Sequence, residues 1–214
     1  MFLIQTIVIV IACLMPLYSK AGTAVTISDS IVTVEGSLSK EVADQFISLM
    51  DGKNIQRVIF HNSTGGSMAA GQRIAARIIN RHISTVVDGY CFSACVTAFL
   101  GGEFREFSAT PGNHVLALHP PYSGGTGEVL ENQKYFYFDW LEKRTRAPLD
   151  TTFQNTLQQI TNPKSAIVIF SENSQLAKKL GTDARYCSGD ENGGFEQCRV
   201  LENLNARSLR LITQ

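Results

Sequence analysis

Short apolar segments alternate with segments of helical periodicity through most of this chain. Residues 57–61 (RVIFH) and 83–87 (ISTVV) have the composition of strands buried inside a sheet. A turn and then a helical pattern follow each of them, at residues 68–80 and 94–100. This alternation predicts an α/β fold with a mainly parallel sheet built from right-handed βαβ units.

The same periodicities predict the remaining elements. A loosely alternating stretch at residues 25–34 and short apolar runs predict further strands, whereas glycine-rich or polar segments predict turns. The further strands are expected at residues 115–118 and 165–170, and the turns at residues 36–39, 62–67 and 89–93. Helices are expected at residues 40–50 with Ser39 as N-cap, 128–146, 150–160 with Asp150 or Thr151 as N-cap, and 171–180 with Ser171 as N-cap.

The first residues have the composition of an export signal. Residues 2–18 are nearly all apolar and are followed by the small residues Ser19 and Ala21. We therefore expect residues 1–21 to be a signal peptide, cleaved after Ala21, of a periplasmic or secreted protein. An uncleaved membrane anchor is an alternative, because a spanning helix needs at least about 17 residues. A lipoprotein is another, since VIAC, ending at Cys13, resembles a lipobox.

Four cysteines lie outside this leader. An even number in an exported chain suggests two disulfide bonds, and the simplest pairing is local: Cys91 with Cys95, and Cys187 with Cys198. Free buried thiols or a zinc site are the alternatives. Zinc is not expected, because neither pair has the two-residue spacing of zinc ligands and no histidine lies near the second pair.

The composition is that of one globular domain with a short extension. Hydrophobic residues make up 44% of the 214 residues and charged residues 18%, which suffices for a sizeable core. We predict a domain at residues 25–185 and an extension at 186–214 that holds the second cysteine pair. Lys+Arg and Asp+Glu are 19 each, so the chain shows no basic excess that would indicate nucleic-acid binding.

A candidate nucleophile and a candidate base lie near predicted strand ends. Ser93 lies between a predicted strand and helix, where a serine is either an N-cap or a nucleophile. The segment 62–67 (NSTGGS) can expose backbone N–H groups, so Gly66 is a candidate to bind an oxyanion together with Ala94. His119, after an apolar strand, is the candidate base. Since the carboxyl ends of neighbouring strands carry the sites of α/β sheets, we expect these residues to meet.

The order of these motifs resembles the Clp protease proteolytic subunit of the crotonase superfamily. The resemblance covers residues 31–183 and is carried by RVIFHNSTGGSMAAG and by the segment from DGYCFSAC to LALHPP. It implies a Clp protease/crotonase-like fold in which Ser93 is the nucleophile and His119 the base. The oxyanion donors would be the N–H groups of Gly66 and Ala94.

The same resemblance implies partners and a cellular setting. Residues 128–160 match the family's protruding helical handle, which implies homo-oligomer contacts through this segment. The Cys-x-Ser-Ala-Cys motif resembles an exported bacterial branch of the superfamily. Outside the cytoplasm there is no ATP, so we expect no ATPase partner and no cofactor. The expected substrates are peptides or unfolded protein.

The family's triad aspartate has no counterpart here. The matching residues, 166–168, are Ala-Ile-Val, and Asp150, Asn162 and Glu172 are the candidate third members. We predict an exported serine hydrolase, an ATP-independent peptidase, that uses either such a residue or a Ser–His dyad. The alternatives are a non-catalytic binding or assembly protein on the same scaffold, or an acyl-thioester enzyme, which the scarcity of coenzyme A outside the cell disfavours.

Overall fold

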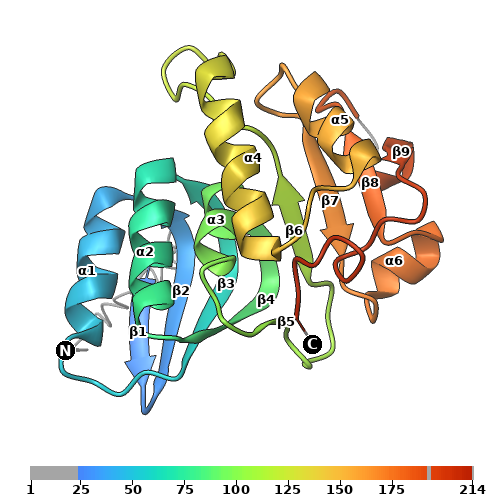
Figure 1. The fold of residues 1–214 in the computed structure, drawn as a ribbon. Helices are drawn as coiled ribbons and strands as arrows, with labels where there is room; N and C mark the ends of the chain where they lie inside the picture. The colour runs from blue at the N-terminus through green and yellow to red at the C-terminus, as the bar shows by residue number, and fades with distance from the viewer. Residues whose placement is uncertain (1–23, 192–193, 214) are drawn as a thin grey trace, which may run out of the picture.

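All strands of the computed structural model, which describes residues 24–191 and 194–213, join a single sheet (Figure 1). The predicted leader, residues 1–21, lies outside the described residues. The strands are β1 Ala24–Ser28, β2 Ile31–Leu38, β3 Arg57–Gly66, β4 Ser84–Phe92, β5 Arg105–Phe107, β6 Val115–Leu118, β7 Ala166–Phe170, β8 Ala184–Cys187 and β9 Arg199–Val200. The helices are α1 Lys40–Met50, α2 Met68–Asn80, α3 Ala94–Phe99, α4 Glu131–Thr145, α5 Thr151–Gln159 and α6 Gln175–Leu180, with a short 3-10 helix, η1, at Phe195–Gln197.

The sheet is parallel in its centre and antiparallel at both sides. Its order is β1-β2-β3-β4-β6-β7-β8-β9, and β5 pairs with the first half of β4. The strand pairs β2–β3, β3–β4, β4–β5 and β4–β6 are parallel, whereas β1–β2 and the pairs from β6 to β9 are antiparallel. The predicted α/β fold with central βαβ units is therefore confirmed.

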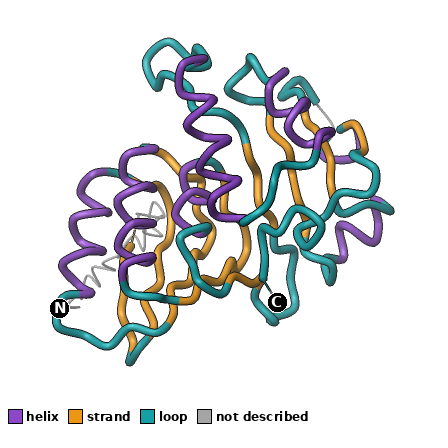
Figure 2. The backbone as a smooth tube through the Cα atoms, viewed as in Figure 1, coloured by secondary structure: helices purple, strands orange, loops and turns teal. Residues whose placement is uncertain are grey.

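The two faces of the sheet are covered by different elements. Alternate side chains of β6 and β7 point to opposite faces. Leu116 and Ile167 pack in the large core with residues of α4 and α5, which lie in front of the strands in Figure 2. Ala117 and Val168 pack in a second, smaller cluster with α6 and Phe195. This second face carries the cavity described below.

Two of the predicted helix caps are present in the structure and one is not. The side chains of Ser39 and Asp150 accept hydrogen bonds from the helix N–H groups three residues on, at 3.3 and 3.0 Å. Ser67 caps α2 in the same way. The helix expected at residues 171–180 begins instead at Gln175 with Ser174 as its cap. The predicted start was wrong because the Ser174 hydroxyl, and not that of Ser171, accepts the hydrogen bond from the Ala177 N–H in the first turn of α6.

Three expected turns are strand residues in the structure. β2, β3 and β4 continue into the segments expected as turns at residues 36–39, 62–67 and 89–93. Gly36 and Gly89 have φ values of 82° and 84°, which allow a strand to kink and still continue. The pairing registers of β2–β3 and β3–β4 shift once each, as in a β-bulge. These glycines therefore bend the strands rather than end them.

None of the helices in residues 24–191 and 194–213 is long and apolar enough to cross a membrane. The loop before α4 and the first turns of α4 project beyond the end of β6 (Figure 1). The first turns of α4 lie in the segment, residues 128–160, that the sequence matched to a helical handle, whereas most of the loop precedes this segment.

Candidate active site

Ser93 lies at a sharp turn between β4 and α3. Its backbone has φ 55° and ψ −124°, a conformation that L-residues rarely adopt. Such backbone strain costs on the order of 1–3 kcal/mol and is found preferentially at functional sites. The Ser93 N–H donates a hydrogen bond to the Ala117 carbonyl at 2.8 Å, which ties the turn to β6. The hydroxyl makes no capping hydrogen bond to α3, so it remains available for chemistry.

A disulfide bond spans this turn. Cys91 at the end of β4 and Cys95 in the first turn of α3 are bonded, with Cα atoms 5.3 Å apart, and both side chains are fully buried. The second bond joins Cys187 to Cys198. Both pairs match the local pairing expected from the sequence. The described residues contain no cluster of His, Cys, Asp and Glu side chains that could hold a metal ion.

Gly65 brings the end of β3 against the Ser93 turn. A Cβ atom at Gly65 would clash with the Phe92 carbonyl oxygen, and it would lie 2.8 Å from Ser93 Cβ and 2.9 Å from Ala94 N. No side chain fits this space, and the φ of 80° also favours glycine. The glycine-rich segment and the serine turn, predicted to meet, are thus in direct backbone contact.

Two N–H groups near Ser93 can bind an anion. Ala94 begins α3, and within the described chain its N–H donates to no acceptor, as expected at a helix start. Gly66 lines a cavity together with Ser93. The next N–H, that of Ser67, donates to the Leu38 carbonyl of β2. The two predicted oxyanion donors therefore both lie near Ser93: Ala94 follows it in the chain, and Gly66 shares a cavity with it.

His119 follows β6 and is nearly buried, with 9% of its surface exposed. Its Nδ1 lies 2.8 Å from the Pro120 carbonyl oxygen. A carbonyl can only accept a hydrogen bond, so Nδ1 carries the proton and Nε2 keeps its lone pair. Desolvation by burial lowers the pKa of His119 below its usual value, although the bond to Pro120 acts in the opposite direction. The ring is therefore neutral at pH 7 and can act as a base.

Ser93 and His119 line the same two cavities. One has a volume of about 290 Å³ and is mostly apolar, and the other, which includes Gly66, has a volume of about 350 Å³. Tyr122 also lines both, and its ring centre lies 5.0 Å from that of His119. No hydrogen bond between Ser93 and His119 is present in the described part of the chain. In enzymes without bound substrate, the distance between nucleophile and base is often too long for a hydrogen bond. The absence of this bond therefore does not exclude a catalytic pair.

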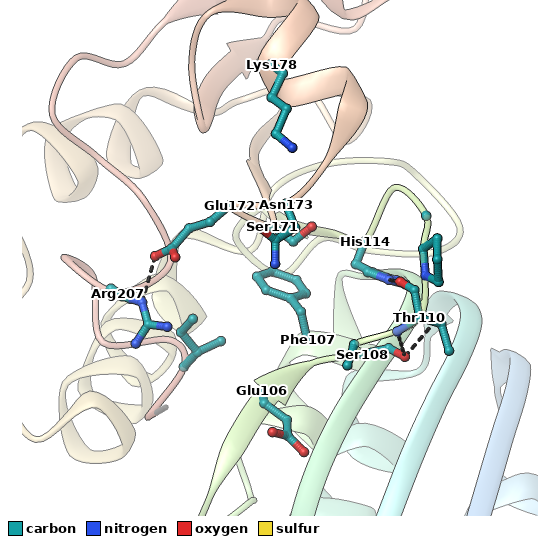
Figure 3. Close-up of a pocket in the computed structure, with 14 residues that line it drawn as sticks. Glu106, Phe107, Ser108, Thr110, His114, Ser171, Glu172, Asn173, Lys178 and Arg207 are labelled. Carbon is teal, nitrogen blue, oxygen red and sulfur yellow. Dashed lines mark hydrogen bonds and ion pairs between the residues drawn. The ribbon is translucent and has the colours of Figure 1, made fainter.

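None of the three candidate orienting residues contacts His119. Asp150 caps α5, and the Asn162 amide donates to a backbone carbonyl near the second disulfide. Glu172 forms an ion pair with an arginine in a separate cavity (Figure 3). The group that orients the His119 ring is instead the Pro120 carbonyl.

A family model covers this site. Residues 20–162 match the model described as Clp protease. The chain belongs to the Clp protease family. Membership supports a serine-peptidase type of function, and the matched residues include Ser93, His119 and the two predicted oxyanion donors, Gly66 and Ala94. The part of the chain after residue 162 lies outside the match.

Solved structures of two other Clp-family proteins are similar to this chain. ClpP1 from Listeria monocytogenes is 16% identical, with 71% of this chain and 86% of that chain covered and a TM-score of 0.49. The ClpP protease catalytic domain from Plasmodium falciparum is 19% identical, with 70% and 80% covered and a TM-score of 0.49. No curated protein matches the sequence.

In a larger cavity of this Clp-family chain, the histidine is not available as a base. It has a volume of about 530 Å³ and is lined by the β5–β6 connection and by residues near α6 (Figure 3). Both ring nitrogens of its histidine, His114, are occupied: Nδ1 accepts from the Gly89 N–H and Nε2 donates to the Thr110 carbonyl, each at 2.9 Å. The Ser93 site is therefore the better candidate for nucleophilic catalysis.

The sequence did not predict three contributors to the site. The Pro120 carbonyl is a backbone group, and the residue type does not predict where a carbonyl points. The Pro-Pro pair after His119 indicates only that the conformation there is restricted. Tyr122 follows that pair, and an aromatic residue close to a candidate base was the only signal. Phe195 lies 102 positions after Ser93 and reaches the cavity only through the pairing of β7 and β8.

Proposed function

We propose that this protein is an exported serine hydrolase, an ATP-independent peptidase that acts on peptides or unfolded protein. One observation carries the proposal: a serine in a strained strand-to-helix turn shares two cavities with a buried, neutral histidine whose Nε2 is free. These are the features that an activated nucleophile requires.

The residues divide the reaction between them. The Ser93 hydroxyl attacks the substrate carbonyl while His119 Nε2 takes its proton. The N–H groups of Gly66 and Ala94 stabilise the negative charge that develops on the carbonyl oxygen. His119 then gives the proton to the leaving group, and a water molecule activated by the same nitrogen releases the acyl group from Ser93.

Pro120 takes the place of the missing triad acid. Its carbonyl holds the His119 tautomer that leaves Nε2 free, which is one of the two tasks of a triad aspartate. It carries no negative charge, so it stabilises the protonated imidazole less than a carboxylate does. We therefore propose slower turnover than a full triad would give, suited to exposed or unfolded peptide segments.

Export and independence from ATP rest on the sequence and on the disulfides. Residues 1–21 have the pattern of a signal peptide, and the two disulfide bonds fit an oxidising compartment. A Clp-family protein in a periplasmic or extracellular location would act without an unfolding ATPase, because that location provides no ATP.

The direct test is covalent labelling of the oxidised mature protein with a fluorophosphonate. We expect one adduct, located on the peptide that contains Ser93 by mass spectrometry, and no adduct in Ser93→Ala. Attachment to a different serine, or no attachment to protein shown to be folded by circular dichroism, would reject the proposed chemistry.

A non-catalytic binding or assembly role is the second candidate. It is favoured by the neutral partner of His119, since no carboxylate of the described residues reaches that ring. It predicts that Ser93→Ala keeps the full biological activity of the native protein. The labelling experiment separates the two candidates, because a binding protein has no need of an activated serine.

The helical segment at residues 128–160 has the surface of an interface. Tyr135 and Phe136 on α4 are 76% and 75% exposed. Two polar atoms of the same helix, Tyr137 Oη and Trp140 Nε1, are buried without a hydrogen-bond partner within the described chain. Exposed aromatic residues of this kind are typical of interface centres. We propose that the protein forms a homo-oligomer through this segment.

Replacing both Tyr135 and Phe136 with serine is expected to reduce the oligomer to a smaller species, because each aromatic side chain can bury about 150–250 Å². Sedimentation velocity at matched concentrations measures the change. Phe104→Ser is the control, since Phe104 is 53% exposed but lies outside the segment. Equal sedimentation of both variants and the native chain would contradict the proposed interface.

A further inference from the structure

The apolar cavity beside Ser93 has a wall from outside the region that the family model matches. Cys187 and Phe195 line it together with Phe92, Ala117 and Val168. Cys187, Phe195 and Val168 belong to the part of the chain after residue 162, whereas Phe92 and Ala117 come from β4 and β6. A Clp-family site is thus completed here by a C-terminal segment.

The Phe195 ring, which lines this cavity, packs against buried residues of the sheet. It lies edge-on to the Phe170 ring, with 5.3 Å between centres and an interplanar angle of 84°. Phe195 also packs against the buried cluster that contains Ala117 and Val168. An edge-to-face aromatic pair with this geometry favours one ring position. The ring therefore limits the depth of the cavity.

A buried arginine and a disulfide bond hold Phe195 in place. Arg185 is 7% exposed, and its guanidinium donates to the carbonyl oxygens of Phe195, Glu196 and Cys198 at 3.1, 3.1 and 2.9 Å. The Cys187–Cys198 bond joins the two ends of the segment that carries this ring. These hydrogen bonds to backbone carbonyls fix η1, and the ion pair between Lys179 and Glu196, at 2.9 Å, adds a side-chain contact to the same segment.

We propose that Phe195 determines the specificity of the Ser93 site. Its ring forms a wall of the pocket that receives the side chain on the acyl side of the cleaved bond, and it sets the size of the apolar side chain that fits there. The inference rests on the proposed function. The cavity of about 290 Å³ is mostly apolar and large enough for one side chain, which supports an apolar occupant.

The test compares p-nitrophenyl esters of N-acetyl alanine, leucine, phenylalanine and tryptophan, which share one leaving group. In Phe195→Ala, kcat/KM for the phenylalanine and tryptophan esters is expected to rise by about tenfold or more relative to the leucine ester, as for other hydrophobic pockets. Most of the gain should appear in KM, because the reacting groups are unchanged.

A second variant guards against a simple loss of folding. Phe195→Trp should shift selectivity in the opposite direction, toward the alanine ester, and destabilisation cannot produce shifts of opposite sign. Tyr186→Ala is the control, because Tyr186 precedes Cys187 in β8 but lines neither cavity. Unchanged selectivity in both Phe195 variants, with turnover that still requires Ser93, would overturn this inference and leave the proposed function intact. Absence of any Ser93-dependent turnover by the native protein would overturn both.

Discussion

Hydrolysis by Ser93→Ala and by His119→Ala is expected to fall by at least about 100-fold, and by up to about 10⁶-fold, the loss seen when a full triad loses either residue. The position within this range measures how well the Pro120 carbonyl replaces an acid. Burst-free steady-state assays with an N-acetyl leucine ester give the two values.

The double variant is expected to lose no more activity than either single variant, because a nucleophile and its base act as a unit. His61→Ala is the matched control. His61 has a carboxylate partner, Asp88, 3.2 Å from its Nδ1, which makes it a rival base on electrostatic grounds. It lines neither of the two cavities, so its loss should leave hydrolysis unchanged. Additive losses, or loss of activity in His61→Ala, would refute the assignment of His119 as the base.

Three independent restraints hold the Ser93 turn in its strained form. The Cys91–Cys95 bond spans it, the Ala117 carbonyl accepts its N–H, and Gly65 packs directly on its backbone. Backbone strain persists only where the surroundings over-determine it. A serine that served only as a helix cap would need none of these restraints, since capping residues adopt ordinary extended backbone. This combination therefore favours a chemical role for Ser93.

The central elements, and the proximity of Gly66, Ser93 and His119 around one cavity, could be predicted from the sequence because local rules govern them. Helical periodicity predicts α1 and α2, and Ser39 marks the start of α1. Parallel pairing of β3 and β4 brings Gly66 and Ser93 to the same end of neighbouring strands. A glycine in the sequence does not distinguish a turn from a bulge within a strand. Gly36 and Gly89 indicated turns, yet tertiary pairing keeps both in strands, so only the sheet decides between a bulge and a turn.

The group that orients His119 could not be predicted, because it depends on a backbone conformation. Asp150, Asn162 and Glu172 have side chains with the right chemistry, but each bonds elsewhere. The Pro120 carbonyl acts through its position alone. Sequence patterns identify functional side chains far more readily than functional carbonyls, because every residue type carries the same carbonyl.

Gly65→Ala is expected to destabilise the protein by more than about 3 kcal/mol, because a left-handed backbone and a backbone clash each cost about 1–3 kcal/mol. The added Cβ would meet the Phe92 carbonyl, Ser93 Cβ and Ala94 N, so β3 and the serine turn must separate. Urea unfolding followed by circular dichroism measures the change in free energy, and fluorophosphonate labelling measures the state of the turn.

Gly52→Ala is the matched control for this experiment. Gly52 also has a positive φ, 69°, but a Cβ there would meet no atom within 4 Å. Its substitution should cost only the backbone penalty, about 1–2 kcal/mol, and leave labelling of Ser93 unchanged. The difference between the two variants isolates the contact between Gly65 and the turn. If both variants unfold at the same urea concentration and label equally, the close approach of β3 does not shape the site, and Gly66 loses its place as an oxyanion donor.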